Sequence, residues 1–411
     1  MWRNYLKVGL RALARNKTYA FINIFGLALG LAACLLLFVY VRYETRYDVW
    51  VPDGERVFQV QTVSLDPDES ESPLDQYTHG ILAESWAREF PQIEAIARLD
   101  EVNPVLLREG GEPSFAPMHL TEANFFRIVA LPFLRGDRTT ALDSLDALVL
   151  SRTEAINRFG SVDIVGRTVT AVRRGEQYNL RVTGVFEDIP RNSHMAFRAI
   201  ARLGETDREE CGWGCINSFV YLKLRRGADL SEIERQLPAW ERRSIPPVDV
   251  GGQQRREGDR YDWRIVNLRD VHLSGAPGPL DRPGNDRRTI LTFAIVAALI
   301  LGMATVNFVN LATARASQRA REVALRKVLG ATRGQLIAQF LMESALVTGL
   351  AVVLALVTVE LALPWLAAFL DADLRAHWFG AGGLAMPVVA LWSVVAVAGG
   401  IYPAFYLSRY R

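Results

Sequence analysis

Four long runs without charged residues alternate with polar segments along this chain of 411 residues. The hydrocarbon core of a bilayer requires about 20 consecutive apolar residues, and a soluble protein rarely holds several uncharged runs of that length. We therefore predict a membrane protein with four transmembrane α-helices. Their expected bounds are residues 18–41, 289–314, 335–370 and 384–408, the third being interrupted by Glu343 and Glu360.

The segments outside these spans differ in length and character. Residues 1–17 repeat basic side chains every four positions beside a leucine-rich face, which predicts a cytoplasmic amphipathic helix at the membrane surface. Residues 42–288 are long enough to form a large extracytoplasmic domain. A basic loop at residues 315–334 and a short external loop at residues 371–383 connect the remaining spans.

The large domain mixes strand-like and helix-like patterns without a nucleotide-binding βαβ fingerprint, so we expect an α+β fold, formed as two subdomains. The predicted helix at Ser231–Leu237 opens with a Ser231/Glu234 capping box and ends at Pro238. The Gly- and Pro-rich segment Ser274–Gly284 is interpreted as a hinge into the second span. The other predicted elements are strands at Arg56–Val63, Ala147–Ser151, Leu180–Phe186, Phe219–Leu224 and Trp263–Leu268, and helices at Ile81–Phe90 and Arg152–Phe159.

Charge is distributed unevenly behind the overall net charge of +2. Residues 42–288 hold 33 Lys and Arg against 40 Asp and Glu, a net charge of −7. The short basic segments at the N-terminus, at residues 315–334 and at the C-terminus fall on one side of the membrane if the four spans alternate. The positive-inside rule places that side in the cytoplasm. Because topology explains the basic residues, no nucleic-acid partner is expected.

The basic loop has more structure than a simple connector needs. Gly330 is suited to end one short helix, and Thr332 with Gln335 forms a capping box that would begin the next. A helix held along the cytoplasmic face in this way is suited to docking a soluble partner.

Catalytic and cofactor motifs are absent from the sequence. The four lysines do not follow a glycine, so no P-loop exists, and any ATP used by this protein must be bound by a partner subunit. No H-E-x-x-H or G-x-S-x-G motif is present. The five histidines are interpreted as surface or structural residues. We therefore predict neither enzymatic activity nor a metal or cofactor site in this chain.

A few polar or small residues within the spans stand out. Asn307 and Asn310 lie late in the second span, and Glu343 lies near the cytoplasmic start of the third. Ionisable groups at membrane depth are functional candidates, but the favoured interpretation is that Glu343 lies close enough to the interface to pair with an arginine such as Arg315. Gly26 and Gly30 form a small-xxx-small pair in the first span, a weak packing signal.

Cys211 and Cys215, in the sequence CGWGC, are the two cysteines of the exported domain. Outside the cytoplasm a local disulfide between them is expected. It would stabilise the fold little, because such a short closed loop removes little entropy from the unfolded chain.

Several segments resemble a known family, the FtsX-like, MacB-type permeases of ABC transporters. The resemblance covers nearly the whole chain, and its most specific part is NFVNLATARASQRAREVALRKVLGATRGQLIAQFLMES at residues 307–344. The N-terminal NYLKVGLRALARNKTYAFINIFGLALG and the C-terminal IYPAFYLSRYR are similar to the first and last spans of the family. FGSVDIVGRTVT and NSHMAF resemble its periplasmic core domain.

The resemblance implies a bacterial inner-membrane permease that transmits motion from a separate ABC ATPase to its periplasmic domain, for export or extraction of a drug, peptide or lipid-linked cargo. The alternative is an FtsX-like regulator of an envelope enzyme or sensor; a membrane-anchored enzyme is disfavoured. Expected partners are the ATPase, membrane lipid and a periplasmic adaptor or envelope protein. The residues expected to couple to the ATPase are Arg321, Glu322, Arg326, Lys327, Gly330 and Arg333.

The longer members of this family carry a second, similar half. This sequence has no internal repeat and stops at Arg411. Two interpretations follow: the chain is a four-span subunit that forms a homodimer, or it is the first half of a longer permease whose halves form a pseudo-dimer.

Overall fold

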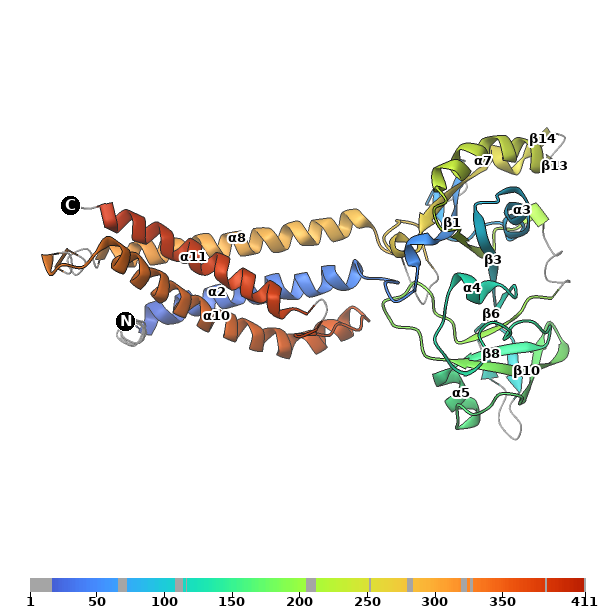
Figure 1. Ribbon diagram of the computed structural model, residues 1–411, viewed down its shortest axis with the longest axis horizontal. Coiled ribbons are helices and arrows are strands. Elements are labelled where there is room, and N and C mark those ends of the chain that lie inside the picture. Colours follow the sequence, from blue (N-terminus) through green and yellow to red (C-terminus); the bar gives the residue numbers. More distant parts are fainter. Residues whose placement is uncertain are drawn as a thin grey trace. The chain divides into compact units, whose positions relative to one another are not determined.

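The protein is described from a computed structural model that divides into two compact units (Figure 1). A membrane unit comprises Met1–Tyr43 and Arg288–Arg411, and an ectodomain comprises Glu44–Arg287. The structure describes residues 17–65, 72–107, 114–115, 117–204, 212–250, 253–278, 284–318, 324–325, 328–380 and 383–409. The amphipathic helix predicted at residues 1–17 lies outside these residues, apart from Lys17.

In the described part of the membrane unit, four long helices are apolar (Figure 1). Helices α2 (Lys17–Glu44), α8 (Arg287–Gln318) and α10 (Arg333–Phe369) are long and apolar enough to cross a bilayer. The fourth, α11 (Ala385–Arg409), contains a shorter apolar stretch at Ala385–Ile401. The helical form suits the apolar interior of a membrane, because a helix makes its backbone hydrogen bonds within its own segment.

Glycine and alanine allow the helices of the membrane unit to pack closely. A Cβ atom added at Gly30 of α2 would lie 2.5 Å from the Cβ of Ala304 on α8. A Cβ atom at Gly399 of α11 would lie 2.0 Å from the Phe308 ring of α8. Small residues at such crossings let helices gain dispersion contacts that lipid would otherwise make. Of the predicted pair, only Gly30 serves this purpose, because no atom lies within 4 Å of a Cβ atom built at Gly26.

The start of α10 confirms the capping box predicted from the sequence. The Thr332 hydroxyl accepts a hydrogen bond from the Gln335 backbone N–H at 3.4 Å, and the Thr332 backbone N–H donates to the Gln335 side chain at 3.0 Å. Gly330, two residues earlier, has a φ angle of 93°. Glycine adopts this left-handed conformation without the steric cost that a side chain would impose.

One lobe of the ectodomain is a βαββαβ arrangement. Its strands are β1 (Val57–Ser64), β3 (Ile93–Val102), β12 (Ser218–Leu224) and β15 (Tyr261–Asn267), all antiparallel to their neighbours. They lie in the order β15-β1-β12-β3, which is the order 4-1-3-2 of a ferredoxin-like sheet. Helices α3 (Ile81–Glu89) and α7 (Leu230–Ser244) connect strands one to two and three to four.

The second lobe is inserted between β3 and β12 and continues the same sheet. The long strand β3 pairs with β12 from Ile93 to Asp100 and with β6 (Met118–Thr121) from Leu99 to Val102, so it joins the lobes. From β6 the sheet continues through β11 (Ala199–Arg202), β8 (Ala147–Ser151), β10 (Glu176–Phe186) and β9 (Thr168–Arg173) to the short strands β4 (Val105–Leu107) and β5 (Ser114–Phe115). The two expected subdomains therefore share one hydrogen-bonded sheet within a single compact unit.

Smaller elements complete the two lobes. They are β2 (Leu74–Asp75), α4 (Phe125–Ile128), β7 (Phe133–Gly136), α5 (Arg152–Phe159) and the separate hairpin β13 (Pro247–Val250) with β14 (Gln253–Arg256). Short 3-10 turns lie at Gly54–Arg56, Gly212–Gly214, Glu257–Asp259 and Leu268–Asp270.

Helix α7 differs from the sequence prediction at both ends. It begins after Asp229, whose side chain accepts a hydrogen bond from the Ser231 N–H, so the predicted Ser231/Glu234 box is wrong. It continues through Pro238 to Ser244 rather than ending at the proline. The side chains of Ile233, Leu237 and Trp240 are buried along one face of α7. This packing outweighs the hydrogen bond lost at an internal proline.

Two buried histidines of the ectodomain are held in the neutral form. His79 packs against Trp213, Tyr261 and Trp263, and burial, with a smaller effect of the Arg260 charge, lowers its pKa from 6.5 to about 4. Burial lowers the pKa of His119 to about 4 as well. Desolvation disfavours the charged imidazolium in both places.

Replacing Gly30 by valine should push α2 away from Ala304 and lower the free energy of unfolding by about 1–3 kcal/mol, the usual cost of overpacking. Gly26→Val is the matched control in the same helix and should change it by less than about 0.5 kcal/mol. Thermal unfolding in detergent micelles measures both. Equal destabilisation by the two variants would contradict the packing assigned to Gly30.

The ectodomain should lose stability in acid. The unfolded chain binds protons at His79 and His119 below pH 6.5, whereas the folded chain binds them only near pH 4, so the free energy of unfolding should fall between these values. The loss should approach about 3 kcal/mol for each histidine. His119→Gln should flatten the pH dependence, measured by denaturant titration from pH 7 to 4. Replacing the exposed His377 by glutamine should leave it unchanged.

Candidate functional site

The residues predicted to couple to an ATPase are only partly described. Gly330 and Arg333 are exposed at the junction between the basic loop and α10. Arg321, Glu322, Arg326 and Lys327 lie outside the described residues, so their role stays a prediction. Arg315, at the start of the predicted basic loop, is described and lies in the last turn of α8.

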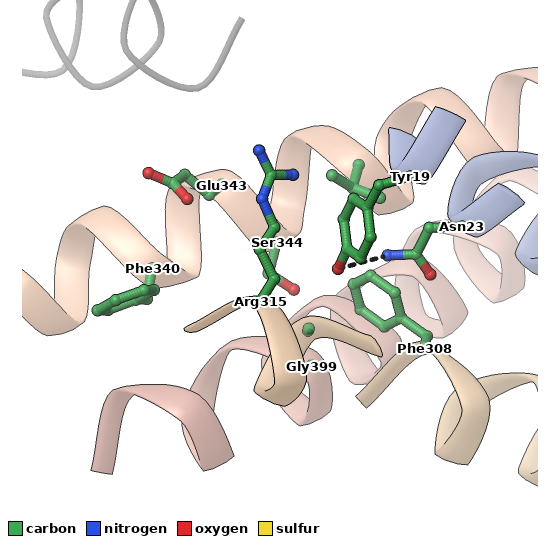
Figure 2. A pocket seen from close by; sticks show the side chains of 10 residues that line it. Tyr19, Asn23, Phe308, Arg315, Phe340, Glu343, Ser344 and Gly399 are labelled. Carbon is green, nitrogen blue, oxygen red and sulfur yellow. Dashed lines mark hydrogen bonds between the residues drawn. The ribbon is translucent and has the colours of Figure 1, made fainter. Parts of the chain in front are cut away.

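A small polar cavity of about 60 Å³ lies where all four membrane helices meet (Figure 2). Tyr19 and Asn23 of α2, Arg315 of α8, Glu343 of α10 and Gly399 of α11 line it. The Asn23 side-chain amide donates to the Tyr19 hydroxyl at 3.2 Å, and the guanidinium carbon of Arg315 lies 4.7 Å from the centre of the Tyr19 ring. Such a cation–π contact is strengthened when water is excluded.

The three predicted intramembrane polar residues separate in the structure. Glu343 lines the cavity and accepts a hydrogen bond at 3.0 Å from Gln339, one turn earlier on α10. Figure 2 shows the Arg315 side chain between Glu343 and Tyr19. Asn307 and Asn310 are exposed on the surface of α8 and do not line this cavity. The cavity therefore unites Glu343 with Arg315 and leaves the two asparagines on an outer surface.

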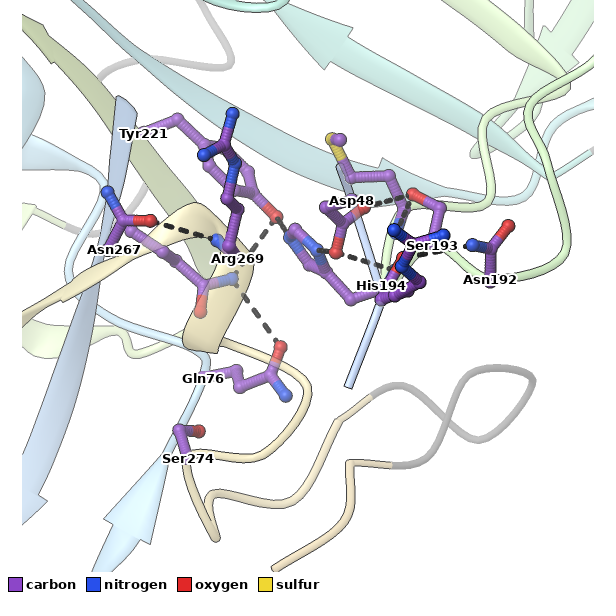
Figure 3. Close-up of polar contacts among 12 residues, drawn as sticks. Asp48, Gln76, Asn192, Ser193, His194, Tyr221, Asn267, Arg269 and Ser274 are labelled. Carbon is purple, nitrogen blue, oxygen red and sulfur yellow. Dashed lines mark hydrogen bonds and ion pairs between the residues drawn. The ribbon is translucent and has the colours of Figure 1, made fainter. Parts of the chain in front are cut away.

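In the ectodomain, the carboxylate of Asp48 is fully buried soon after the end of α2 (Figure 3). It accepts hydrogen bonds from the Ser193 hydroxyl, from the His194 backbone N–H at 3.3 Å and from His194 Nδ1 at 2.7 Å. The Asp48 N–H donates to the Asn192 carbonyl at 3.0 Å. Asp48 also has a left-handed backbone with φ of 56°, which aspartate tolerates better than most residues.

A chain of buried polar side chains extends from this aspartate across the sheet. His194 Nε2 lies 2.9 Å from the Tyr221 hydroxyl, to which Gln59 Nε2 donates at 3.1 Å. Gln61 donates to Gln59 at 2.8 Å and to the Ser274 hydroxyl at 3.3 Å. Burial raises the pKa of Tyr221, so its hydroxyl keeps its proton and can donate to His194. These contacts join residues that are far apart in the sequence.

A second buried carboxylate, Glu44, ties the entry of the ectodomain to its exit. His272 Nε2 lies 2.8 Å from the Glu44 carboxylate, and the Asn285 side-chain amide donates to the same oxygen at 2.8 Å. The Tyr47 ring stacks on His272 with 3.4 Å between ring centres. Glu44 is the last residue of α2, and Asn285 lies two residues before α8.

The segment predicted to be a hinge, Ser274–Gly284, is held at both of its ends. Ser274 pairs with Asp286 in an isolated bridge, and the Asn285 N–H donates to the His272 carbonyl at 2.6 Å. Gln76 donates to the Ala276 carbonyl at 3.3 Å. Residues 279–283, in the middle of the segment, lie outside the described residues. The described parts of this segment are therefore fixed by hydrogen bonds to the rest of the ectodomain. The hinge interpretation stays a prediction.

The cysteines agree in part with the sequence analysis. Cys215 is disulfide-bonded. Cys211 lies outside the described residues, so its predicted pairing with Cys215 stays a prediction. Cys34 is a free, buried thiol in α2. Within the described residues, no cluster of three or more His, Cys, Asp or Glu side chains could hold a metal ion.

Sequence reasoning missed both ectodomain networks. NSHMAF was noted only as part of a resemblance, yet it supplies Ser193 and His194 to the Asp48 carboxylate. Asp48 and His194 are 146 positions apart, so no local pattern reveals the contact. The local sequence gives the opposite indication for Gln59 and Gln61, because their alternation with Val60 is typical of a strand with one face in water.

Comparison with known proteins places these features in a family. A model of the MacB-like periplasmic core domain matches residues 20–240, which is more than half of the chain. A model of the FtsX-like permease C-terminal region matches residues 294–409. No curated protein matches the chain.

Three solved structures have weaker similarity. A permease domain from Porphyromonas gingivalis has 19% identity over 53% of this chain and 94% of its own, with a TM-score of 0.43. The periplasmic region of MacB from Actinobacillus actinomycetemcomitans has 13% identity over 52% of this chain and 90% of its own, with a TM-score of 0.35. The extracellular domain of the noncanonic ABC-type transporter YknZ from Gram-positive bacteria has 11% identity over 44% and 88%, with a TM-score of 0.29.

The two family models decide the assignment, because they match both the ectodomain and the three spans that follow it. The apolar helices agree with a multi-pass membrane protein that carries an extracytoplasmic domain. The chain belongs to the FtsX-like, MacB-type family of ABC transporter permeases.

Proposed function

We propose that this chain transmits motion driven by a separate cytoplasmic ATPase to its ectodomain, for export or extraction of a drug, peptide or lipid-linked cargo. The observation that carries the proposal is the polar cavity of the membrane unit. It joins Arg315, in the last turn of α8 and close to the basic loop, to Tyr19 on α2, with Glu343 of α10 in the same cavity. A displacement of the loop would therefore also displace α2 and α10, which contribute Tyr19 and Glu343 to this cavity.

Helix α8 supplies a direct route along the chain. Its 32 residues form one continuous helix, which spans about 48 Å at 1.5 Å per residue. The loop follows one end of α8, and Asn285, which donates to Glu44, precedes the other. Because Glu44 ends α2, the two segments that enter and leave the ectodomain share one buried anchor. We propose that displacement of α8 reaches the ectodomain through this anchor.

The orientation that fits this route has both termini and the basic loop in the cytoplasm. The positive-inside rule supports it, since the N-terminal 17 residues contain five basic residues and no acid. Residues 42–288, with their net charge of −7, would then lie in the periplasm of a bacterial inner-membrane protein.

We also propose that α8 contacts a second permease half, either another copy of this chain or a similar repeat. In the apolar stretch of α8 only 11% of the residues are buried, against 33% in the corresponding stretches of α2 and α10. Asn307 and Asn310 are exposed on α8, and exposed amides are costly in lipid. A partner helix that hydrogen-bonds to these amides would remove that cost.

Replacing Glu322 or Arg326 by alanine should abolish the stimulation of ATP hydrolysis by this chain, because the docking charges would be lost. The measurement uses the full chain in nanodiscs with the ATPase that co-purifies from its native membrane. Arg138→Ala, at an exposed ectodomain position, is the control and should keep the stimulation. Unchanged ATPase stimulation in the properly inserted loop variants would rule out the docking assignment.

A further inference from the structure

A larger cavity, of about 370 Å³, opens in the ectodomain where the two lobes join. Its floor is one face of the sheet, formed by β3, β12 and β6 through Leu99, Phe219 and His119. The segment at residues 194–198, which leads into β11, lines it as well. The volume falls within the range of small-molecule sites, about 300–1,000 Å³.

The lining of this cavity carries one acidic and one basic side chain. Glu101 and Arg198 are both exposed, so each lies where the cavity meets solvent. The Tyr77 hydroxyl donates to the Glu101 carboxylate at 3.2 Å and orients it. His119 lies directly opposite Glu101 on the neighbouring strand and is neutral at pH 7. The cavity lining therefore carries one negative and one positive side chain, Glu101 and Arg198, rather than an excess of either charge.

Aromatic side chains form the apolar part of the lining. Tyr77 and Phe219 pack with 4.3 Å between ring centres, and the Phe197 ring meets the edge of His119 at 5.1 Å. His119 is 92% buried, and its Nδ1 has no hydrogen-bond partner among the described residues. Rings of this kind bind apolar or aromatic bodies through large contact areas at little entropic cost.

Strand register sets the spacing between the two charges. Glu101 on β3 is opposite His119 on β6, which is opposite Ile200 on β11. Arg198 lies two positions before Ile200. Its Cα atom is therefore separated from that of Glu101 by two inter-strand spacings of about 4.8 Å each and is also displaced by two residues along the strand. The two Cα atoms are thus on the order of 10 Å apart, which leaves room for a small molecule between the charged groups.

We propose that this cavity binds a small zwitterionic molecule with an aromatic or bulky apolar side chain, of the size of an amino acid or dipeptide. Arg198 would bind its carboxylate, Glu101 its ammonium group, and the aromatic lining its side chain. The volume equals that of roughly a dozen water molecules at about 30 Å³ each, which is too small for a folded cargo.

Binding in this cavity would act on the buried network described above. His194 and Tyr221 line the cavity and also form the hydrogen bond that connects Asp48 to Gln59. A ligand that packs against these two side chains stabilises that arrangement of the lobes. The proposal does not depend on ATPase coupling, since binding can be measured without ATP or a partner.

Three probes with the same phenyl body and different charges test the proposal: L-phenylalanine, 2-phenylethylamine and 3-phenylpropionate. Saturation-transfer NMR on the full chain in nanodiscs should show saturable binding of phenylalanine, with the other two about tenfold weaker, because each lacks one charge-assisted contact. Arg198→Gln should weaken phenylalanine and phenylpropionate but spare the amine. Glu101→Gln should weaken phenylalanine and the amine but spare phenylpropionate.

Both variants change exposed side chains, and unaltered thermal unfolding would confirm that they fold. Arg138→Gln is the matched control for a lost surface charge. The proposal is overturned if no probe binds saturably up to about 10 mM, a generous limit for a weak site. It is also overturned if the variants affect all three probes equally, which would indicate partitioning into the lipid rather than a site.

Discussion

The fold of the ectodomain depends on the burial of one carboxylate, that of Asp48. A carboxylate removed from water is costly unless its oxygens accept hydrogen bonds. Here they accept three, all from Ser193 and His194 in the second lobe. The chain that has just left α2 is thereby fixed to a segment 145 positions later. Tyr221 of the first lobe contacts His194 in turn. The need to satisfy the Asp48 carboxylate therefore fixes the positions of both lobes relative to the segment that enters the ectodomain.

Glu44 imposes a similar requirement four residues earlier. It brings His272 and Asn285 together, so the segments that enter and leave the ectodomain cannot separate without exposing or unpairing a buried charge. Buried polar networks of this kind specify one arrangement when every member is satisfied. That property suits a protein proposed to pass displacement from membrane helices to an ectodomain, since a soft junction would absorb the motion.

Local patterns predicted the parts of the structure that local physics decides. Uncharged runs identified the membrane helices, because lipid tolerates little else. Strand β8 and helix α5 have the predicted bounds, since a short apolar run and a serine cap determine them. The capping box at Thr332 was likewise predictable from four residues. Helix α7 was not, because packing of Trp240 and its neighbours overrides the usual effect of Pro238.

The candidate sites were less predictable, because they depend on contacts between distant residues. Alternation along β1 would place Gln59 and Gln61 in water, yet the polar network buries both. A double-mutant cycle of Asp48→Asn and His194→Gln, read by hydrogen exchange of the segment at residues 192–195, tests the central claim most directly. The account predicts a coupling free energy above about 1 kcal/mol. Additivity within about 0.5 kcal/mol would contradict it.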